Sequence, residues 1–408
     1  MGGAIALGAG YGVVLYEETV HGPGGAVGGG MGGGGGSDDG GPFPGGKPGE
    51  EEGFGIDSVT LNRVAIVSSW AGADGGGLYS AVPATLNQTA VSGNFSGANG
   101  GGIYNDADMT VTESLVGAVF DPATIAQFPD LANGNVGENG GGLFDTGSHT
   151  TTISHSAING NEAIGGGGIA GRALVTIDIT NSTVSGNLAS DVAGGINTNG
   201  TVNLQSVTVA DNFADTDAPG GGAGLNSFGP GVFNFTSTVL QNNQKNALAP
   251  VLSNCGCSGG GPCAGGEMVS GGFNLEDGDS CDMDAVLLSD QINTDALLGV
   301  LLDNGGLTET QALGAGSPAI DAGDDAACQA LASAFDQRGT GFPRRNDGNG
   351  DGVVICDVGA VEAPAVGGGG GGGGCSVAGT QRGFDPLFPL LLAAAGLYWG
   401  FRRRSLNG

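Results

Sequence analysis

The run DGNGDG at residues 347–352 alternates oxygen-bearing side chains with glycines. This spacing is the first half of a calcium-binding loop, in which positions 1, 3 and 5 supply side-chain oxygens and a later backbone carbonyl, here that of Val353, adds another. An EF-hand loop has glutamate at its twelfth position, but Val358 stands there, so Asp357 or Glu362 must substitute. The candidate calcium ligands are Asp347, Asn349, Asp351 and Asp357. The alternative, a solvated acidic turn without metal, stays open.

A second group of residues has the chemistry that polysaccharide hydrolases and lyases use. Hydrolases need clustered carboxylates, and lyases need a base, beside a metal or another charge, that removes a proton next to a carboxyl group. The candidates are Asp106, Asp108, Asp178, His149, His155 and Arg172. The aspartates form no evident cluster, and His155 lies in an alternating strand, where a histidine more often serves structure. We therefore assign no catalytic residue, and a carbohydrate-active enzyme stays the alternative function.

Seven cysteines are present, and six of them precede the glycine run at 367–374. An even number suits an oxidising compartment, where cysteines pair. We expect a disulfide between Cys328 and Cys356, which are 28 residues apart, to add about 3 kcal/mol in the chain-entropy model. The other four are Cys255, Cys257, Cys263 and Cys281. Their spacing lacks the paired C-x-x-C of zinc sites, so two disulfides are expected, with the pairing left open.

The charge balance is one-sided, with 41 acidic and 11 basic residues and a net charge of −30. Affinity for a phosphate backbone comes from Lys and Arg, so this composition argues against nucleic acid as a partner. The same repulsion argues against tight binding of an acidic polysaccharide unless a cation bridges the two. Calcium is the one cofactor that these residues suggest, and the high charge suits an aqueous exterior.

A glycine-rich phrase recurs through residues 56–250, and the elements that this repeat forms must position these side chains. It reads GGGLY, GGGIY, GGGLF, GGGGI, GGI and GGAGL. The apolar residues after the glycines stand at 78, 103, 143, 169, 196 and 225, which gives spacings of 25, 40, 26, 27 and 29. The spacing of 40 indicates one repeat with an insertion, which we place at AVFDPATIAQFPDLANG.

A second phrase keeps step with the first and ends in asparagine. It is VSGN at Asn94, INGN at Asn161, VSGN at Asn187, VADN at Asn212 and VLQN at Asn242. Alternating runs such as VTIDITNSTV precede it and predict strands with apolar side chains inward. Repeats of this length predict an all-β fold, a right-handed single-stranded parallel β-helix, rather than a β-sandwich. The stacked asparagines would form an amide ladder at one corner.

The N-terminal residues carry a fragment of the same pattern. The phrase GGAI at residues 2–5 fits the glycine phrase, so we predict a partial coil over 1–20 and a Gly-rich inserted loop over 21–55. The chain would then begin inside a repeat, with Met1 an internal or misassigned start. The alternative is an atypical secretion signal, although the first basic residue is Lys47 and no A-x-A site follows.

The repeats resemble those of polymorphic outer membrane proteins and other right-handed β-helix surface proteins. Residues 251–290 read as a Cys- and Gly-rich insertion after them. Residues 291–362 resemble the choice-of-anchor Q domain through DNGGLT, GSPAIDAGD, a cysteine, DQRG, an Asp/Asn/Gly run and CDVGAVE, in this order. The resemblance implies the terminal segment of a bacterial β-helix protein. We expect it to cap the C-terminal end of the coils, where unpaired strand edges would otherwise be exposed.

The C-terminal tail resembles a JDVT-CTERM-type sorting signal. A Gly-rich linker at 363–374 leads to residues 375–408, which contain Cys375, the phrase FDPLFPLLL and a basic end. The apolar stretch 387–401 has 15 residues, fewer than the ~20 that span a membrane comfortably. The residues expected to stay on the cytoplasmic side are Arg402, Arg403 and Arg404. The resemblance implies an envelope sorting or processing protease acting at Cys375, with transient membrane contact, and a retained membrane anchor is the alternative.

These patterns together predict an exported protein at the cell surface, in the outer membrane or outside the cell. Its expected role is that of a non-catalytic adhesin, stalk or envelope structural protein. A glycan or another surface ligand would be its further partner.

Overall fold

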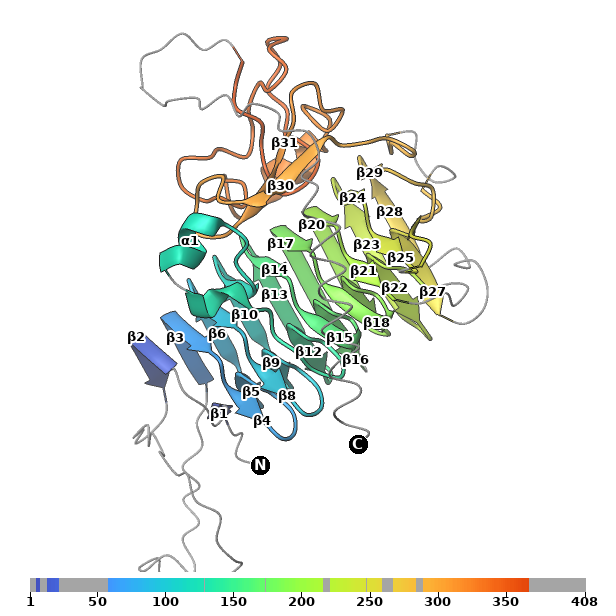
Figure 1. Ribbon diagram of the computed structural model, residues 1–408. Helices are drawn as coiled ribbons and strands as arrows, with labels where there is room; N and C mark the ends of the chain where they lie inside the picture. Colours follow the sequence, from blue (N-terminus) through green and yellow to red (C-terminus); the bar gives the residue numbers. More distant parts are fainter. Residues whose placement is uncertain are drawn as a thin grey trace, which may run out of the picture. The chain divides into compact units, whose positions relative to one another are not determined.

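The computed structural model describes residues 58–366, apart from 128, 173, 216–220, 247, 259–266 and 284–288, and the backbone course of 5–7 and 13–21. The described chain is all-β, with long parallel sheets and few helices. Strands of successive repeats build three sheets, and the second sheet receives one long strand or two short ones from each repeat (Figure 1).

The first sheet contains the strands that follow the glycine phrase. Its order is β1 (Ile5–Leu7), β5 (Leu78–Ser80), β9 (Ile103–Asn105), β12 (Leu143–Thr146), β16 (Ile169–Arg172), β19 (Ile196–Thr198), β22 (Leu225–Phe228) and β27 (Cys255–Ser258). From β5 onward each strand pairs in parallel with the equivalent strand of the next repeat, so that Leu143 stands between Ile103 and Ile169. The predicted repeat is therefore also the unit of strand pairing.

The second sheet contains the alternating runs. Its main path is β13 (Thr150–Ser154), β10 (Met109–Thr112), β6 (Ala84–Asn87), β3 (Ser58–Val67), β7 (Ala90–Ser92), β11 (Leu115–Gly117), β14 (Ala157–Asn159), β17 (Thr176–Ser185), β20 (Thr201–Ala210), β23 (Val232–Thr236) and β28 (Met268–Gly272). Three strands join it from the side, namely β2 (Val13–His21), β24 (Val239–Gln241) and β29 (Leu275–Glu276).

The third sheet is made of shorter strands. It contains β15 (Glu162–Gly165), β18 (Leu188–Val192), β21 (Phe213–Ala214), β25 (Gln244–Lys245) and β26 (Val251–Leu252). A parallel pair, β4 (Trp70–Ala71) and β8 (Phe95–Ser96), continues it through bridges at Val136.

The predicted insertion lies where the spacing of 40 placed it. Residues 118–134 follow β11 and contain α1 (Pro122–Gln127) and the 3-10 helix η1 (Pro129–Ala132). The terminal segment contains the remaining elements, the antiparallel pair β30 (Leu298–Leu302) and β31 (Thr310–Leu313) and the helix α2 (Asp325–Ala330).

Apolar side chains from the sheets form one continuous core. The residues that follow the glycine phrase are all buried, as the alternation predicts: Leu78, Ile103, Leu143, Ile169, Ile196 and Leu225. Residues of the second sheet, such as Leu204 and Phe235, join the same cluster. A single repeat buries little by itself, so the stacking of repeats supplies the hydrophobic stabilisation.

Two corners of each repeat need a left-handed backbone conformation. At one of them φ lies between 43° and 60° in non-glycine residues, namely Arg63, Gln88, Glu113, His155, Asn181, Ser206, Ser237 and Phe273. At the other, the glycine of the asparagine phrase has positive φ, as at Gly186, but Asp211 and Asn242 take that position with φ 57° and 53°. Asn tolerates this conformation better than most residues do. The ladder asparagine of this repeat is therefore Asn243, not Asn242 as predicted.

The predicted amide ladder is present and is longer than the sequence phrase indicated. Each asparagine Nδ2 donates to Oδ1 of the next at 2.9–3.0 Å. The members are Asn94, Asn135, Asn161, Asn187, Asn212, Asn243 and Asn254. Each is essentially buried, and the ladder satisfies amide groups that would otherwise be unpaired in the core.

The N-terminal strands pair differently from the coil predicted for residues 1–20. β1 runs antiparallel to β5, and β2 runs antiparallel to β3. Every strand of a repeat in the first sheet from β5 onward instead runs parallel to its neighbour. The glycine phrase alone does not encode strand direction, because direction depends on the connection that precedes the strand.

Residues 251–276 continue the repeat, although we predicted an insertion over 251–290. β27 pairs in parallel with β22, and β28 with β23. Cys255 takes the core position that Leu225 has in the preceding repeat. A cysteine in place of a branched aliphatic residue concealed the pattern.

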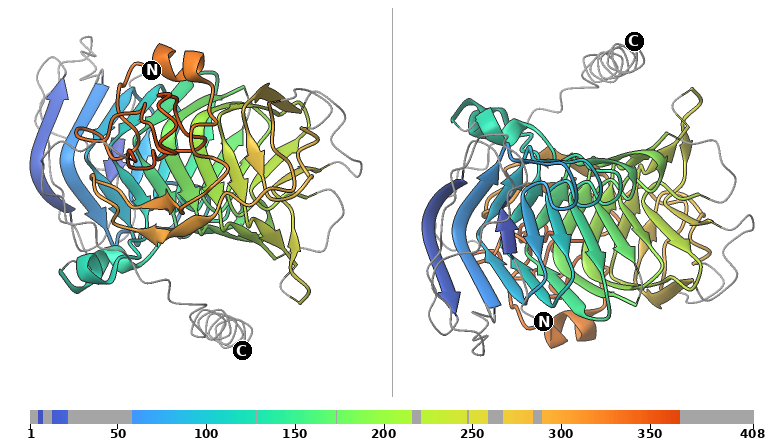
Figure 2. Two further views of the ribbon diagram at one scale, coloured as in Figure 1. Left: turned by 90° about the horizontal axis from the view of Figure 1, so that it is seen from above. Right: turned by 90° about the horizontal axis from the view of Figure 1, so that it is seen from below.

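The terminal segment lies along the second sheet rather than over the end of the coils. Its contacts extend from the insertion to β24, for example Gln337 with Thr183 and Ala360 with Thr208. In the left view of Figure 2, which is seen from above Figure 1, the terminal segment (orange) lies in front of the strands. The prediction of an end cap is therefore wrong for this segment. Residues 274–293 pair with the last strands instead, through the bridge between Leu275 and Gln291.

Candidate functional site

A pocket of about 520 Å³ opens where the first and third sheets meet. β16, β18, β19 and β22 supply most of its walls. It is lined by Asn139, Ile164, Gly165, Arg172, Asp191, Val192, Asn197, Gly221, Asn226, Phe228 and Ser258. Pockets of this size accept small ligands, and a few fixed polar groups among apolar walls give them selectivity.

Arg172 is the cation of this pocket and stands at the end of β16. Its guanidinium lies 4.5 Å over the ring of Phe228, and Nη2 donates to Asn139 Oδ1 at 3.1 Å. Burial lowers the pKa of Arg172. Stacking and the single amide contact fix the plane of the guanidinium, which is how arginine is prepared for planar recognition.

No carboxylate pairs with Arg172 among the described residues. Arg338, Arg344 and Arg345 each form an ion pair with an acid. Nη1 of Arg172 is buried and has no hydrogen-bond partner in the described chain. Buried donors are rarely left without a partner, and a water or an ion would satisfy this one.

A short amide chain adjoins the arginine. Asn226 Nδ2 donates to Asn197 Oδ1 at 2.9 Å, and Ser258 Oγ donates to Asn226 Oδ1 at 3.0 Å. These bonds orient Asn197 and leave its Nδ2 without an acceptor among the described residues. Gly165 provides room beside that amide, since a Cβ there would lie 3.2 Å from Asn197 Nδ2.

The arrangement can therefore hold an oxygen-rich ligand. Arg172 and Asn197 supply N–H donors, while Phe228 and the half-exposed Ile164 supply apolar surface. Among the lining residues that the structure describes, the exposed Asp191 is the one acid and there is no histidine. The described lining residues contain no pair suited to general acid–base work.

Sequence reasoning identified Arg172 but missed the asparagines and Phe228. Asn197 and Asn226 occupy the position directly after the apolar residue of the glycine phrase, where the earlier repeats have Tyr79, Tyr104 and Phe144. Those three rings stack on one another, with centroids 4.8 and 5.3 Å apart. The change from aromatic to amide in that column was a readable signal.

His149 lies in a second polar cluster, apart from the pocket lining. Its Nε2 lies 2.8 Å from Asp145 Oδ1, and Asn105 Nδ2 contacts the same oxygen at 2.8 Å. Burial opposes the charge, but the bond to Asp145 and the fields of Asp145, Asp108 and Asp106 outweigh it and raise the pKa of His149. Two of the predicted acids thus lie near this histidine, which the sequence alone did not indicate.

The remaining two catalytic candidates have structural partners. Asp178 Oδ1 accepts from Asn203 Nδ2 at 2.6 Å on the surface of the second sheet. His155 Nε2 lies 3.0 Å from Ser333 Oγ, so it joins the coil to the terminal segment. Burial lowers the pKa of His155, which favours the neutral ring.

The oxygens of the predicted calcium loop accept hydrogen bonds from the loop's own backbone. Asp347 accepts from Gly350 N and Gly352 N, and Asn349 Oδ1 accepts from Asp351 N. No group of three or more His, Cys, Asp or Glu suited to a metal occurs in the described part of the chain.

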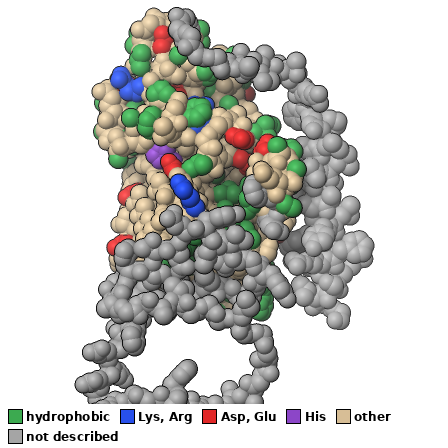
Figure 3. Space-filling model, turned by 90° about the vertical axis from the view of Figure 1, so that its left-hand side faces the viewer, with side chains coloured by type: hydrophobic (Ala, Val, Ile, Leu, Met, Phe, Trp, Pro, Cys, Tyr) green, Lys and Arg blue, Asp and Glu red, His purple; other side chains and the backbone are tan. Residues whose placement is uncertain are grey.

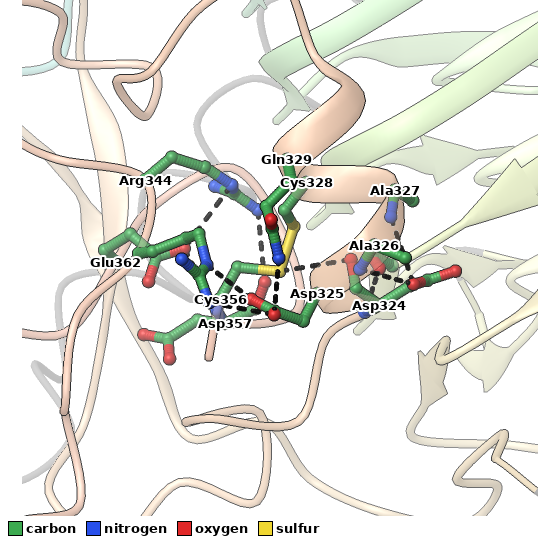
Figure 4. The surroundings of a disulfide bond; sticks show 12 residues. Asp324, Asp325, Ala326, Ala327, Cys328, Gln329, Arg344, Cys356, Asp357 and Glu362 are labelled. Atoms are coloured by element: carbon green, nitrogen blue, oxygen red, sulfur yellow. Dashed lines mark hydrogen bonds and ion pairs between the residues drawn. A yellow bond between two sulfur atoms is a disulfide. The ribbon is translucent and has the colours of Figure 1, made fainter. Parts of the chain in front are cut away.

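The fourth predicted ligand, Asp357, is buried below the loop. Its oxygens accept from Asp321 N and Ala363 N. Burial raises its pKa to about 6. Figure 4 shows it close to Glu362 and Arg344, whose side chains form a buried ion pair at 3.4 Å.

The predicted pair Cys328–Cys356 is present and joins α2 to this network. Cys255 pairs with Cys281, which settles one of the pairings that the sequence left open. Cys257 is also disulfide-bonded.

Several predictions fall on residues outside the described chain. They concern Cys263, the loop 21–55, most of the linker 363–374, and the tail 375–408 with Cys375, the stretch 387–401 and Arg402, Arg403 and Arg404. Within the described residues, no helix has both the length and the apolar character that a membrane crossing requires.

Comparison with known proteins found no match of this chain to a family model, a curated protein or a solved structure.

Proposed function

We propose that this chain is an exported, surface-sorted protein that binds a glycan or related surface ligand through the Arg172 pocket and does not transform it. The observation that carries this proposal is the fixed, unpaired guanidinium of Arg172 among amide donors and apolar walls. A binding module needs this arrangement, whereas a hydrolase would need two carboxylates at catalytic separation in the same pocket.

The proposal includes a right-handed single-stranded parallel β-helix as the scaffold. Parallel pairing of successive repeats in three sheets supports it. Parallel strands joined by a crossover are right-handed in nearly all proteins, which supports the handedness. Such a scaffold holds the pocket rigidly, as an adhesin, stalk or envelope component requires.

Sorting to the cell surface rests on the sequence resemblances. The choice-of-anchor Q-like segment at 291–362 and the JDVT-CTERM-like tail at 375–408 would direct the chain to the envelope, with a protease acting at Cys375. The disulfides Cys255–Cys281 and Cys328–Cys356 are compatible with an oxidising compartment.

The charge distribution supports a partner other than nucleic acid. On the coloured part of the surface in Figure 3, basic side chains occur in small separate groups and form no extended basic patch. With a net charge of −30 the chain would repel a phosphate backbone.

Calcium at Asp347, Asn349 and Asp351 remains part of the proposal. Those oxygens are exposed and close in sequence, so ion binding would need them to exchange backbone N–H partners for the metal. Calorimetric titration of the full chain with Ca²⁺ tests this, with Asp351→Asn as the matched variant. Equal heats for both proteins would exclude this loop.

A carbohydrate-active enzyme is the second candidate, and one observation favours it. Asp145 orients His149 through Nε2, and Asp106 and Asp108 lie close enough to raise the pKa of His149. A histidine oriented by a buried carboxylate is a common general base.

The two functions are separated by one experiment. The full chain is incubated with a glycan panel, with and without Ca²⁺, and both binding and new reducing or unsaturated ends are recorded. Binding without products supports the proposal. Products that disappear in His149→Gln would establish the enzyme instead.

A further inference from the structure

We propose that the Arg172 pocket recognises one carboxylated sugar residue carried on an otherwise neutral glycan. This inference rests on the proposed glycan-binding function and names the class of ligand. Its basis is the combination of an unpaired planar cation, an amide donor and apolar walls in one cavity.

The charge at Arg172 calls for an anion. The other described arginine without an ion pair, Arg63, is exposed and donates to Gln88 Oε1 at 2.9 Å. Arg172 differs because it is partly buried and holds only one amide oxygen. A guanidinium removed from water is stabilised by a carboxylate, which it binds through two parallel N–H bonds.

The geometry of the cation favours a planar carboxylate. The ring of Phe228 covers one face of the guanidinium, and Asn139 holds Nη2. Nη1 has no hydrogen-bond partner in the described chain. An incoming carboxylate would bind N–H groups of this guanidinium that Asn139 leaves free.

The rest of the pocket suits the body of a sugar. Asn197 Nδ2 is directed by its bond to Asn226 and can donate to a ring or hydroxyl oxygen. Ile164 is 51% exposed and Phe228 is partly exposed, so both offer apolar surface to the C–H face of a ring. Oriented donors beside an apolar wall are what a pocket needs to fix a small polar ligand.

The charge of the surrounding protein limits the ligand to a single anion. The lining includes the exposed Asp191, and the chain carries a net charge of −30. The acidic protein would repel every charged unit of a polyanion, whereas a neutral glycan with one carboxylate experiences this repulsion at a single group. We therefore expect a monoanionic oligosaccharide to bind more tightly than a polyuronate.

The test uses calorimetry on the full chain with four probes: a neutral oligosaccharide ending in glucuronic acid, the same oligosaccharide ending in glucose, polygalacturonate and inorganic sulfate. We expect the acidic oligosaccharide to bind at least about tenfold more tightly than the neutral one. Polygalacturonate should bind weakly at low salt and better as salt screens the repulsion. Sulfate at millimolar concentration should not displace the acidic oligosaccharide.

Four variants complete the test. Arg172→Gln should weaken binding of the acidic oligosaccharide by about tenfold or more, and Arg63→Gln, with the same charge change outside the pocket, should leave it within about twofold. Arg172→Lys should recover only part of the affinity, because lysine cannot bind in bidentate fashion. Asp191→Asn should tighten binding by about two- to fivefold, a gain that misfolding cannot produce.

Three results would overturn the inference while leaving glycan binding intact. One is equal affinity for the acidic and neutral oligosaccharides, and another is an Arg172→Gln variant that binds as well as the parent. Displacement by sulfate would also overturn it, because the site would then accept any anion. Failure of the parent to bind any glycan would refute the proposed function as well.

Discussion

The side-chain amide of Asn254 donates to Glu276 Oε1 at 3.1 Å and to Asp277 Oδ1 at 2.8 Å, and these bonds end a ladder of asparagines that begins at Asn94. Every side-chain amide in the ladder donates toward the next repeat. Of the two acceptors at this end, Glu276 is fully buried and also accepts from Ser280 N. Aligned hydrogen bonds polarise one another, so a charged acceptor at the end reinforces the whole series.

Asn187→Ala should destabilise the protein by about 3 kcal/mol or more. The change leaves Asn161 N and Asn161 Nδ2 without their acceptor inside the core, and each unpaired buried group costs about 1–3 kcal/mol. Chemical denaturation measures the loss. Asn203→Ala is the matched control, since Asn203 faces outward and is only partly buried. Equal losses for the two variants would contradict the role given to the ladder.

Glu309 fastens the terminal segment to the insertion, so Glu309→Gln should loosen both. Its carboxylate accepts from Phe120 N at 2.8 Å and also from Asp121 N and Asn159 Nδ2. A carboxamide can accept with only one of its two ends, and the lost bonds should cost about 2 kcal/mol. Hydrogen exchange should become faster in residues 118–134. Glu113→Gln is the matched control, because Glu113 accepts a side-chain hydrogen bond only from Gln88 among the described residues, and it should leave those amides unchanged.

Stability should fall as pH rises from about 4 to about 6. Burial raises the pKa of Asp357 from its usual 3.8 to about 6, and burial also raises the pKa of Glu362. The folded protein then binds a proton more tightly than the unfolded chain, so the contribution is fully present below the unfolded pKa and is lost as pH rises through 6. For Asp357 the loss is about 3 kcal/mol.

Denaturation at four pH values between 4 and 7 checks this prediction. Asp357→Asn should flatten the dependence, while Asp351→Asn, in the exposed loop, should not. Parallel curves for the parent and Asp357→Asn would mean that Asp357 does not titrate in this range.

Removal of the Cys328–Cys356 disulfide should lower stability by about 3 kcal/mol. The two cysteines are 28 residues apart, and a link of that length restricts the unfolded chain by about this amount. The double variant Cys328→Ser with Cys356→Ser, compared with the parent by thermal denaturation, measures the effect. A loss below about 1 kcal/mol would show that Arg344 and Glu362 hold the terminal segment without it.

The repeat and its core were predictable because they are periodic. Residues such as Ile169 and Ile196 recur at a nearly constant spacing, and alternation alone assigns them to the interior. The insertion was predictable for the same reason, because the interval of 40 residues between Ile103 and Leu143 departs from the otherwise nearly constant spacing. The ladder was predictable in kind, but Asn135 and Asn254 were missed. The phrase that ends at Asn135 is ANGN, which lacks the initial valine or isoleucine, and Asn254 follows Asn243 by only 11 residues, which is too short for a repeat.

The location of the terminal segment was not predictable, because it depends on polar contacts between residues far apart in the sequence. Gln337 meets Thr183 and Gln311 meets Asp211 only in the folded chain. The pocket escaped prediction for a similar reason. Asn139, Arg172 and Phe228 come from three different repeats, and nothing local marks them as neighbours.

The most direct test of the account is a crystal structure of the full chain with the acidic oligosaccharide. The account predicts ligand density in the pocket, with the carboxylate beside the guanidinium of Arg172 and the sugar ring against Phe228 and Ile164. Density beside His149 and Asp145, with the pocket empty, would contradict it.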